Sequence, residues 1–436
     1  MAARTWLDNT GGTIATNGAL LLTANALNNA GGTLNSAGTD AAHVRVTGMF
    51  DNTGGLLAGS GALTVDAGSL INRGTAGGED GAAPMGVWAE QLAVTADTID
   101  NANGQLGAND TATLKATTLD NTGGVVTAGN ALTVEASTLN GTNGTLATNG
   151  ALLLTGETTD LRGGTTSANA ITVDTGTLTT AEGQLTASGA GALSLTARQQ
   201  LDNTGGVIAT NGALQIDAGA LTNASGVLQS IGTEAAQVRV AGAFDNTSGL
   251  LAGSGALLIQ AGTLINRDTL ATDEDADPMG VWAESLTAAA DHVDNRAGHL
   301  GGNHALALTA TTLDNRGGAI NAVKTLSVDA ATLNGENGTI ASNGALTLTG
   351  ETTDLRGGAT FAQTMRIDTG TLTTAGATLI AAGDDPLALT VRGQLDNTGG
   401  NIAGNGALLL DAGSLTNTDG ALSAAGKAAT GGRVAG

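Results

Sequence analysis

The sequence predicts an all-β protein, a right-handed parallel β-helix of about twenty coils with roughly 20 residues in each coil. Two observations carry this prediction. A near-identical phrase, LDNTGGTIATNGALLLTANA from Leu7 to Ala26, returns along the chain, and its apolar residues alternate with period two in short segments bounded by glycine. A unit this short cannot bury a core alone, so stacked units are expected. The further copies of the phrase begin at Phe50, Leu119, Leu201, Phe244, Leu313 and Leu395.

Each unit contains three clusters of apolar residues. In the first unit Leu7 stands alone, Ile14 follows the Gly-Gly pair, and Leu20 and Leu22 follow Asn17-Gly18. Alternation with Thr, Ala or Asp is typical of strands, and the segments are too short and too often broken by glycine for helices. Three strands per unit predict one coil, in which every strand pairs with its counterpart in the next coil. The preferred chirality of parallel crossovers favours a right-handed coil.

The corner after the first strand is expected at the fifth and sixth positions of the unit, as in Gly11-Gly12 and Asn103-Gly104. The fifth position accepts residues that tolerate positive φ, and the sixth is nearly always glycine. Three corners depart from this pattern, namely Glu182-Gly183, Ala297-Gly298 and Gly376-Ala377. We expect these three corners to be distorted or shifted.

The third position of the unit is usually asparagine. Coils about 4.8 Å apart would stack these side chains into an amide ladder, in which each side chain bonds to its neighbour and to the corner backbone. We therefore interpret the asparagines as structural, not as ligand-binding or glycan-bearing residues. The predicted ladder consists of Asn9, Asn29, Asn52, Asn72, Asn101, Asn121, Asn203, Asn223, Asn246, Asn266, Asn295 and Asn315.

The units form a larger repeat. Nine units separate Leu7 from Leu201, and the same spacings then resume up to Leu395. The segment 84–90 also returns as 278–284. We therefore predict one continuous β-helix over residues 1–436, with nine-coil blocks at 7–200 and 201–394 and a truncated third block at 395–436. Such a stack would make a rod roughly 100 Å long.

Composition excludes several classes of protein. The formal net charge is −23, from 39 acidic and 16 basic residues. A nucleic-acid backbone is therefore not expected as a partner. The chain contains no cysteine, and no stretch reaches the eighteen or more apolar residues of a membrane span.

No catalytic residue, metal ligand or cofactor site is predicted. His292, His299 and His304 are close in sequence but lack the i, i+4 helical spacing or partner cysteines of a metal site, so we interpret them as surface residues. The acidic run 273–277 leaves two alternatives open, a solvated loop or a cation held by several oxygens.

Two longer units are the places where recognition could depart from the scaffold. Each exceeds the usual length by nine residues and carries the sequence Pro-Met-Gly-Val-Trp. Met and Trp are good contact residues and loops often carry recognition, but the Trp side chains can equally fold back onto the coils. The candidate partner-contact residues are Met85, Val87, Trp88, Met279, Val281 and Trp282.

The phrase beginning at Leu7 and its copies resemble the filamentous haemagglutinin repeat, which builds the shafts of large exoproteins secreted by two-partner systems in Gram-negative bacteria. The resemblance covers nearly the whole chain. It implies a right-handed β-helix that is exported through an outer-membrane two-partner-secretion transporter and is displayed at the cell surface or secreted. A target-cell surface receptor or glycan is a further implied partner.

Such shafts occur in adhesins and in contact-dependent growth-inhibition toxins, and both alternatives stay open. We expect a non-enzymatic shaft segment that projects an adhesive or toxic domain and contacts a partner through its long side loops. The alternative is a secreted polysaccharide lyase or hydrolase on the same scaffold. That alternative would need facing carboxylates and aromatic platforms, whereas aromatic residues make up only 1 % of this chain.

Overall fold

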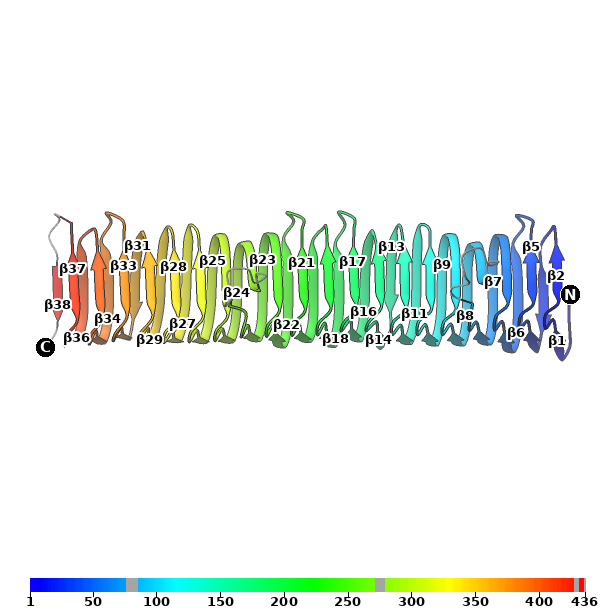
Figure 1. The fold of residues 1–436 in the computed structure, drawn as a ribbon, viewed down its shortest axis with the longest axis horizontal. Coiled ribbons are helices and arrows are strands. Elements are labelled where there is room, and N and C mark those ends of the chain that lie inside the picture. Colours follow the sequence, from blue (N-terminus) through cyan, green and yellow to red (C-terminus); the bar gives the residue numbers. More distant parts are fainter. Residues whose placement is uncertain (76–84, 271–278, 427–430, 435–436) are drawn as a thin grey trace. The chain divides into compact units, whose positions relative to one another are not determined.

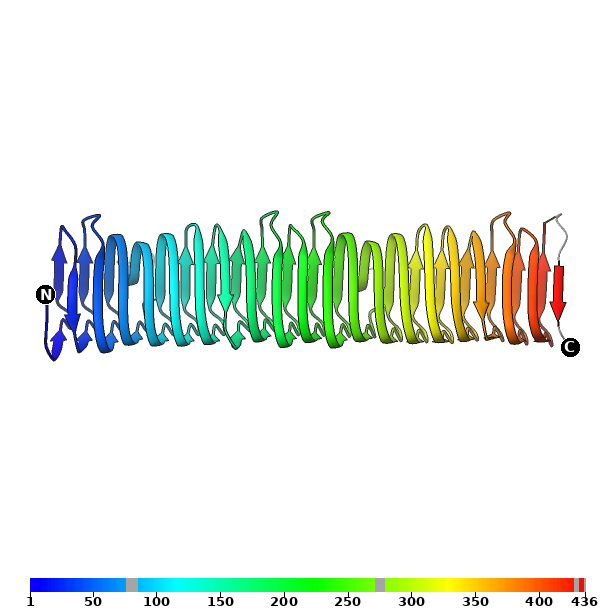
Figure 2. The same ribbon diagram turned by 180° about the vertical axis from the view of Figure 1, so that it is seen from behind.

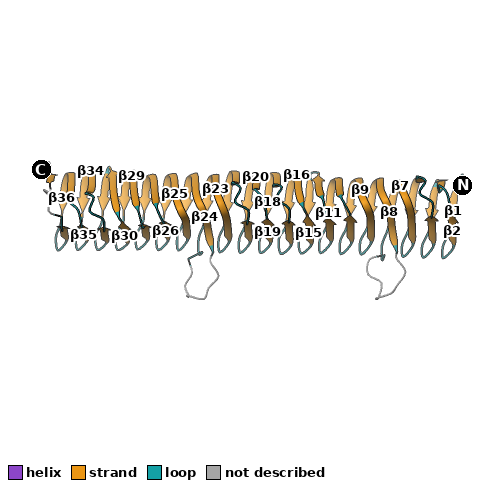
Figure 3. Cartoon of the chain, turned by 90° about the horizontal axis from the view of Figure 1, so that it is seen from above, coloured by secondary structure: helices purple, strands orange, loops and turns teal. Residues whose placement is uncertain are grey.

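The computed structural model describes residues 1–75, 85–270, 279–426 and 431–434. It contains two compact units, Met1–Ala218 (unit 1) and Gly219–Gly436 (unit 2). Every regular element in the described residues is a β-strand, drawn as an arrow in Figure 1, in the reverse view of Figure 2 and in orange in Figure 3. The predicted all-β class is therefore confirmed.

The strands that begin in unit 1 are β1 (Trp6–Asp8), β2 (Thr13–Thr16), β3 (Leu21–Ala24), β4 (Ala26–Asn28), β5 (Thr33–Ser36), β6 (Ala42–Asp51), β7 (Leu56–Ile71), β8 (Gly86–Asp100), β9 (Gln105–Asp120), β10 (Val125–Ala128), β11 (Ala131–Asn140), β12 (Thr145–Thr148), β13 (Ala151–Thr155), β14 (Thr158–Asp160), β15 (Thr165–Ala168), β16 (Ala170–Thr179), β17 (Gln184–Ala187), β18 (Leu193–Asp202), β19 (Val207–Thr210) and β20 (Leu214–Thr222).

The strands of unit 2 are β21 (Val227–Ser230), β22 (Ala236–Asp245), β23 (Leu250–Ile265), β24 (Gly280–Asp294), β25 (His299–Asp314), β26 (Ala319–Ala322), β27 (Thr325–Asn334), β28 (Thr339–Ser342), β29 (Ala345–Asp354), β30 (Ala359–Ala362), β31 (Thr364–Thr369), β32 (Thr371–Thr373), β33 (Thr378–Ala381), β34 (Leu387–Asp396), β35 (Asn401–Gly404), β36 (Leu408–Thr416), β37 (Ala421–Ala424) and β38 (Gly431–Val434).

Within each unit the coils stack through parallel pairing, with like positions of the repeat aligned. The middle strands of two successive coils align Val126 with Leu146. Their third strands, β11 and β13, align Leu132 with Leu152. The chain is a β-solenoid of about twenty turns with roughly 20 residues per turn, as predicted. The third strand of one coil often runs on into the first strand of the next, as in β11, so the two appear as one bent element.

The core consists of the inward residues of all three strands. Leu34, Leu57 and Leu106 are fully buried, and so are the two phenylalanines Phe50 and Phe244. Most outward neighbours of core residues are partly or fully exposed, as in β10 and β19, which is the alternation expected of strands with one buried face. Gly107, beside Leu106, is a buried exception. Burial of aliphatic side chains from successive coils therefore forms one continuous core within each unit.

The corner after the first strand has the same backbone geometry whether or not glycine occupies its fifth position. Gly123 has a φ of 60°, while Glu182 and Ala297 have φ values of 58° and 48°. The i to i+3 backbone bond is also kept, with Gly183 N donating to Thr180 O at 3.0 Å and Gly298 N to Asn295 O at 3.0 Å. The expected distortion of these two corners is wrong, because the coils on either side impose the left-handed conformation on the residue present.

The third unusual corner, Gly376-Ala377, is also regular, with Ala377 N donating to Thr374 O at 2.9 Å. At Gly124, a Cβ atom would lie 2.2 Å from the backbone oxygen of Asn101 in the preceding coil and 2.6 Å from Asn121 Oδ1. The corner at Ala377 has Thr374 in place of the asparagine, so the conflict with an amide oxygen of its own corner does not arise there. Glycine at the sixth position thus leaves room for a backbone carbonyl as well as for the amide.

The third-position asparagines of unit 1 form a hydrogen-bonded column from Asn9 to Asn121. Asn29 Nδ2 donates to Asn52 Oδ1 at 2.7 Å, and Asn52 Nδ2 donates to Asn72 Oδ1 at 2.8 Å. Asn52 Nδ2 also lies 3.3 Å from Gly55 O at its own corner. Unit 2 has an equivalent column through Asn223, Asn246, Asn266, Asn295 and Asn315.

The amide column of unit 1 stops for three coils, where Gly141, Leu161 and Thr180 occupy the third position. Leu161 is buried, and its Cδ2 would lie 3.0 Å from a Cβ at residue 141, so its side chain fills the space above that glycine. The column resumes where Thr180 Oγ1 donates to Asn203 Oδ1 at 2.8 Å. Unit 2 repeats this substitution with Gly335, Leu355 and Thr374, and Thr374 Oγ1 lies 2.8 Å from Asn397 Oδ1.

The coil in the middle of the unit 1 interruption also has a more polar core. Thr159 aligns with Leu139 below it and Leu178 above it, and Thr166 aligns with Leu146 and Leu185 in the same way. Both threonines are buried. Thr159 Oγ1 donates to Thr175 Oγ1 at 3.2 Å, which supplies a partner inside the core.

Candidate functional site

The predicted partner-contact residues occupy two different environments. Val87 and Val281 are fully buried, because they align with the core residues Leu57 and Leu251 of the preceding coils. They cannot contact a partner from these positions, which narrows the prediction to Met85, Trp88, Met279 and Trp282. These four side chains are half-buried.

Both loop tryptophans lie back on the coil that follows them. The ring of Trp88 covers Gly107, and the ring of Trp282 covers Gly301, so that neither glycine has room for a Cβ. Trp88 Nε1 donates to Met85 O at 2.8 Å, and Trp282 Nε1 donates to Met279 O at the same distance. The indole N–H groups are thus satisfied within the chain, and any contact with a partner would use the remaining exposed part of each ring.

Trp282 has an additional neighbour that Trp88 lacks. Its ring meets the His299 ring edge to face, with centroids 4.0 Å apart. Asn321 Nδ2 lies 3.1 Å from His299 Nε2, and burial lowers the pKa of His299 to about 4. His299 is thus a neutral packing residue at neutral pH. Gln105 holds the corresponding position beside Trp88.

Two of the other histidines are held by ordinary surface contacts. His43 Nε2 lies 2.8 Å from Asp66 Oδ2, and His292 Nδ1 lies 2.7 Å from Thr312 Oγ1. No cluster of three potential metal ligands occurs among the residues described. The acidic run 273–277, for which cation binding was left open, lies outside the described residues.

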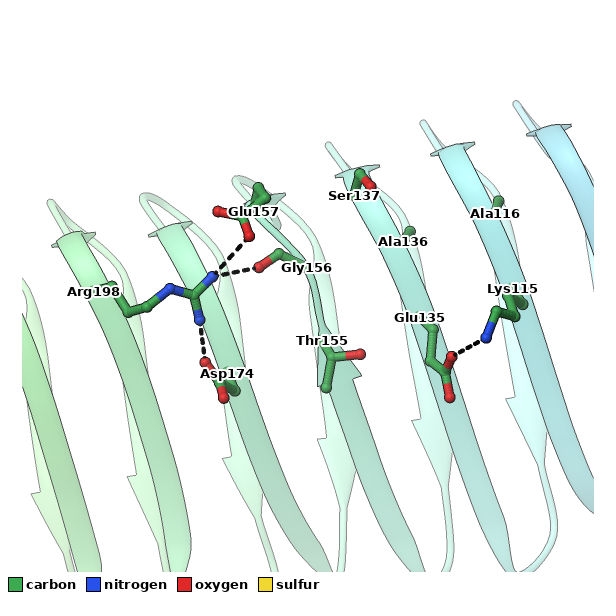
Figure 4. A pocket seen from close by; sticks show the side chains of 10 residues that line it. All are labelled: Lys115, Ala116, Glu135, Ala136, Ser137, Thr155, Gly156, Glu157, Asp174 and Arg198. Carbon is green, nitrogen blue, oxygen red and sulfur yellow. Dashed lines mark hydrogen bonds and ion pairs between the residues drawn. The ribbon is translucent and has the colours of Figure 1, made fainter.

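A surface hollow of about 360 Å³ crosses several coils of unit 1, among them coils in which the amide column is interrupted. We call it the Arg198 groove, and Figure 4 shows the side chains around it. Its charged residues are Lys115, Glu135, Glu157, Asp174 and Arg198. They come from β9, β11, the β13–β14 turn, β16 and β18, and parallel stacking of these strands brings them together.

The coil that begins at Leu161 is short, with 17 residues (161–177). Arg198 reaches across this short coil and bonds to the coil that precedes it. Its Nη1 pairs with Asp174 Oδ1, while its Nη2 donates to Gly156 O at 2.9 Å and lies 3.3 Å from Glu157 Oε1. At the other end of the groove Lys115 Nζ lies 2.9 Å from Glu135 Oε2. The carboxylates are thus engaged with cations on the protein and do not form the facing pair that glycoside cleavage requires.

The same arginine bridge recurs in unit 2. Arg392 Nη1 donates to Asp368 Oδ1 at 2.7 Å, and its Nη2 donates to Gly350 O at 2.8 Å and to Glu351 Oε1 at 3.2 Å. Sequence reasoning missed both bridges, because each joins residues 42 positions apart across an intervening coil. The signal was the recurrence of an arginine after each short coil.

A row of alternating charges follows the corners of unit 2. Asp294 Oδ2 lies 3.3 Å from Arg267 Nε and 2.8 Å from Arg296 Nη2, and Arg316 pairs with Asp314 in the next coil. Partial burial acts to raise the pKa of Asp294, but the hydrogen bonds and charge of Arg296, together with Arg267, lower it below its usual value. These arginines are neutralised by their neighbours and do not form an anion-binding stripe.

Comparison with known protein families decides the assignment. The family model of the haemagglutinin repeat matches residues 2–45, 39–83, 88–156, 128–205, 189–233, 230–277 and 281–350. The chain belongs to the haemagglutinin repeat family. The resemblance seen in the sequence is thereby confirmed.

Membership places the chain among structural, adhesin-type repeats in the context of two-partner secretion, which typify secreted or surface-exposed bacterial proteins. No curated protein and no solved structure shows significant similarity to it. In the described residues there is also no helix with the length and apolar character needed to cross a membrane.

Proposed function

We propose that the chain is a shaft segment of a large exoprotein on a Gram-negative bacterium, and that it holds an adhesive or toxic domain away from the cell. The observation that supports this most directly is the family match over a stack of near-identical coils. Each coil adds about 4.8 Å along the stack. A repeated scaffold of this kind provides length and stiffness without a separate core for every domain.

The shaft role can be tested through reach. The full chain would be inserted between a two-partner secretion domain and a fluorescent tip, and the height of the tip above the outer membrane would be measured by super-resolution microscopy. Removal of residues 201–394, a proposed block of nine coils, should lower the tip by about 40 Å.

The control replaces that block by a flexible Gly/Ser linker with the same number of residues. The linker should give a broad distribution of heights, because such chains behave as random coils. Equal heights and widths for the native block and the linker would exclude a rigid spacer.

We propose that export uses an outer-membrane two-partner-secretion transporter. The cysteine-free sequence supports passage as an unfolded chain, since no disulfide has to be broken or re-formed. Deletion of the transporter gene in the same reporter strain should leave the shaft in the periplasm. Surface display that persists without the transporter would contradict this route.

The half-buried loop residues Met85, Trp88, Met279 and Trp282 are proposed as contacts for a target-cell receptor or glycan. Aromatic and methionine side chains are enriched at interfaces, which supports this assignment. The double variant Trp88→Ala/Trp282→Ala should weaken binding to target cells at least about tenfold.

Trp6→Ala is the matched control, because Trp6 is the remaining tryptophan and is exposed. Its variant should bind as the unaltered chain does. Unchanged binding by the double variant would remove the loops as contacts and would leave the shaft role intact.

A further inference from the structure

Among the described residues of unit 1, one outward face carries no charged residue. This uncharged face comprises the outward side chains of the ten middle strands, and Figure 3 shows β2, β15 and β19 following one side of the unit. These side chains belong to Thr13, Ala15, Thr33, Asn35, Leu56, Ala58, Trp88, Gln105, Val125, Thr127, Thr145, Ala147, Thr165, Ser167, Gln184, Thr186, Val207 and Ala209. The two remaining outward positions are the buried glycines Gly86 and Gly107.

The middle strands of unit 2 follow the same rule. Residues 227–230, 250–253, 280–283, 299–302, 319–322, 339–342, 359–362, 378–381, 401–404 and 421–424 contain no Asp, Glu, Lys or Arg. The chain as a whole has 16 basic and 39 acidic residues. Exclusion of charge from so many solvent-facing strands needs a cause, because an ordinary exposed sheet face mixes charged and polar side chains.

The other two faces show the contrast. The third strands of unit 1 present Lys115, Glu135 and Asp174, and the first strands present Asp100 and Asp120. Every coil has the same backbone requirements on all three faces. The absence of charge from one face therefore does not follow from β-helix formation.

The uncharged face is also partly apolar. Leu56, Val125 and Val207 are half-exposed on it, between threonines and alanines. Trp88 adds little height, because its ring lies on Gly107 and its N–H is bonded to Met85 O. Small and β-branched side chains on a flat sheet are the type of surface that packs against a second sheet at about 10 Å.

We propose that this face is the docking surface for a second copy of the chain, with the two sheets packed face to face. Charge selects this occupant. Each copy has a net charge of −23, so contact through either of the other faces brings like charges together. Contact through the uncharged face leaves those charges in solvent on the outer sides of the pair.

The area of the face fits the same occupant. Strands of four residues are about 13 Å long, and ten coils extend for about 48 Å, so one unit offers about 600 Å². A standard protein interface buries about 800 Å² on each partner. One unit thus supplies most of the area of a specific interface, and no single middle strand has to provide an anchoring pocket.

The test is sedimentation velocity of the complete 436-residue chain from about 1 to about 200 µM. The unaltered chain should form a dimer reversibly, and added salt should maintain or strengthen association by screening the net negative charge. The triple variant Gln105→Glu/Thr127→Glu/Thr165→Glu should weaken association at least about tenfold. The control is Thr113→Glu/Thr133→Glu/Thr172→Glu, which adds the same charge to the same three coils on the third strands.

Mixing provides a second, positive readout. The triple variant Gln105→Lys/Thr127→Lys/Thr165→Lys should also be monomeric. Its mixture with Gln105→Glu/Thr127→Glu/Thr165→Glu should associate again. A monomeric unaltered chain at all concentrations would overturn the proposal, even if the chain bound a glycan. Equal weakening of association by the face variant and by its control would also overturn the proposal. So would a dimer that the face variant leaves intact, because such a dimer would indicate end-to-end contact.

A measurement without added charge covers the case in which the triple variants fail to fold. The chain has no native cysteine, so Thr127→Cys and Thr133→Cys can each be labelled with a thiol reagent. As protein concentration rises, labelling should slow at residue 127 and should stay constant at residue 133. Constant labelling at both positions would overturn the proposal.

Discussion

The coils from Asn9 to Asn121 and the three coils that follow them stabilise the same corner in different ways. In the first region each amide bonds to the next coil, and Asn52 has partners on both sides. In the second region, Gly141 and Leu161 replace that bond by close packing. Hydrogen bonding and close packing thus support the same backbone geometry. The corner conformation is therefore determined more by the stacking of the coils than by the residues at the corner.

The largest difference is expected from removal of a central amide. Asn52→Leu would leave Asn29 Nδ2 and Asn72 Oδ1 without their side-chain partners, and each buried orphan costs about 1–3 kcal/mol. We expect the free energy of unfolding to fall by about 3 kcal/mol, against about 1 kcal/mol for Thr180→Val, which removes one hydroxyl donor shared between Asn203 Oδ1 and Asp202 O.

Hydrogen exchange of the amides in the flanking coils would measure both effects locally. Thr53→Ala, on the exposed neighbour of Asn52, is the control. Equal losses for Asn52→Leu and Thr180→Val would mean that the column adds nothing beyond a single hydroxyl bond.

His299 gives unit 2 a pH-dependent contribution to stability that Gln105, at the equivalent position of unit 1, cannot make. Its folded pKa of about 4 lies below the value of about 6.5 in an unfolded chain. The unfolded state therefore takes up the proton first, so stability is fully present above about pH 6.5 and falls as the pH drops toward 4. Between pH 7 and pH 5 the free energy of unfolding should fall by on the order of 2 kcal/mol.

His299→Gln introduces the residue found at position 105 of unit 1 and should remove that loss. Urea unfolding followed at pH 7 and pH 5 would compare the two chains. A loss of the same size in the variant would assign the dependence to other groups.

The packing solution can be tested at Gly141. Gly141→Ala places a Cβ 3.0 Å from Leu161 Cδ2 and should cost about 1–2 kcal/mol through overpacking. In the Leu161→Ala background the same substitution should cost less, because the closest conflict is gone and only the approach to Asp160 O at 3.2 Å remains. A double-mutant cycle with no coupling between the two sites would show that Leu161 does not fill this space.

The smallest effect is expected at the arginine bridge. Arg198→Met removes contacts with Asp174, Glu157 and Gly156 O, but the arginine side chain is 45 % exposed and water competes for these contacts. We expect a loss of about 0.5–1 kcal/mol, and less for Lys115→Met, which breaks one exposed pair. Thermal unfolding in low and high salt would rank the two, and a larger loss at Lys115 would contradict a special role for the bridge.

Much of this architecture could be predicted from one sequence because every coil repeats the same physical problem. The period gave the stack, and the recurring asparagine at positions such as Asn9 and Asn29 pointed to the ladder. Val87 was misjudged because it was considered with its loop, although alignment with Leu57 places it in the core. A positive φ at Glu182 could not be foreseen, since local preference opposes it and only the neighbouring coils require it.

The features that escaped prediction depend on distances between coils that are not adjacent, or on what fills a space. Arg198 meets Gly156 across an intervening coil. Leu161 Cδ2 lies close to Gly141 of the preceding coil. Neither relation is visible in the period itself.

The amide column has a direction. Asn9, Asn29, Asn52, Asn72 and Asn101 each donate toward the carboxyl-terminal neighbour. The amide dipoles therefore point the same way and polarise one another. Gly141 ends that alignment after Asn121. The dipoles of each column therefore add in one direction. A substitution in the middle of the column should weaken the amide hydrogen bonds on both sides of it.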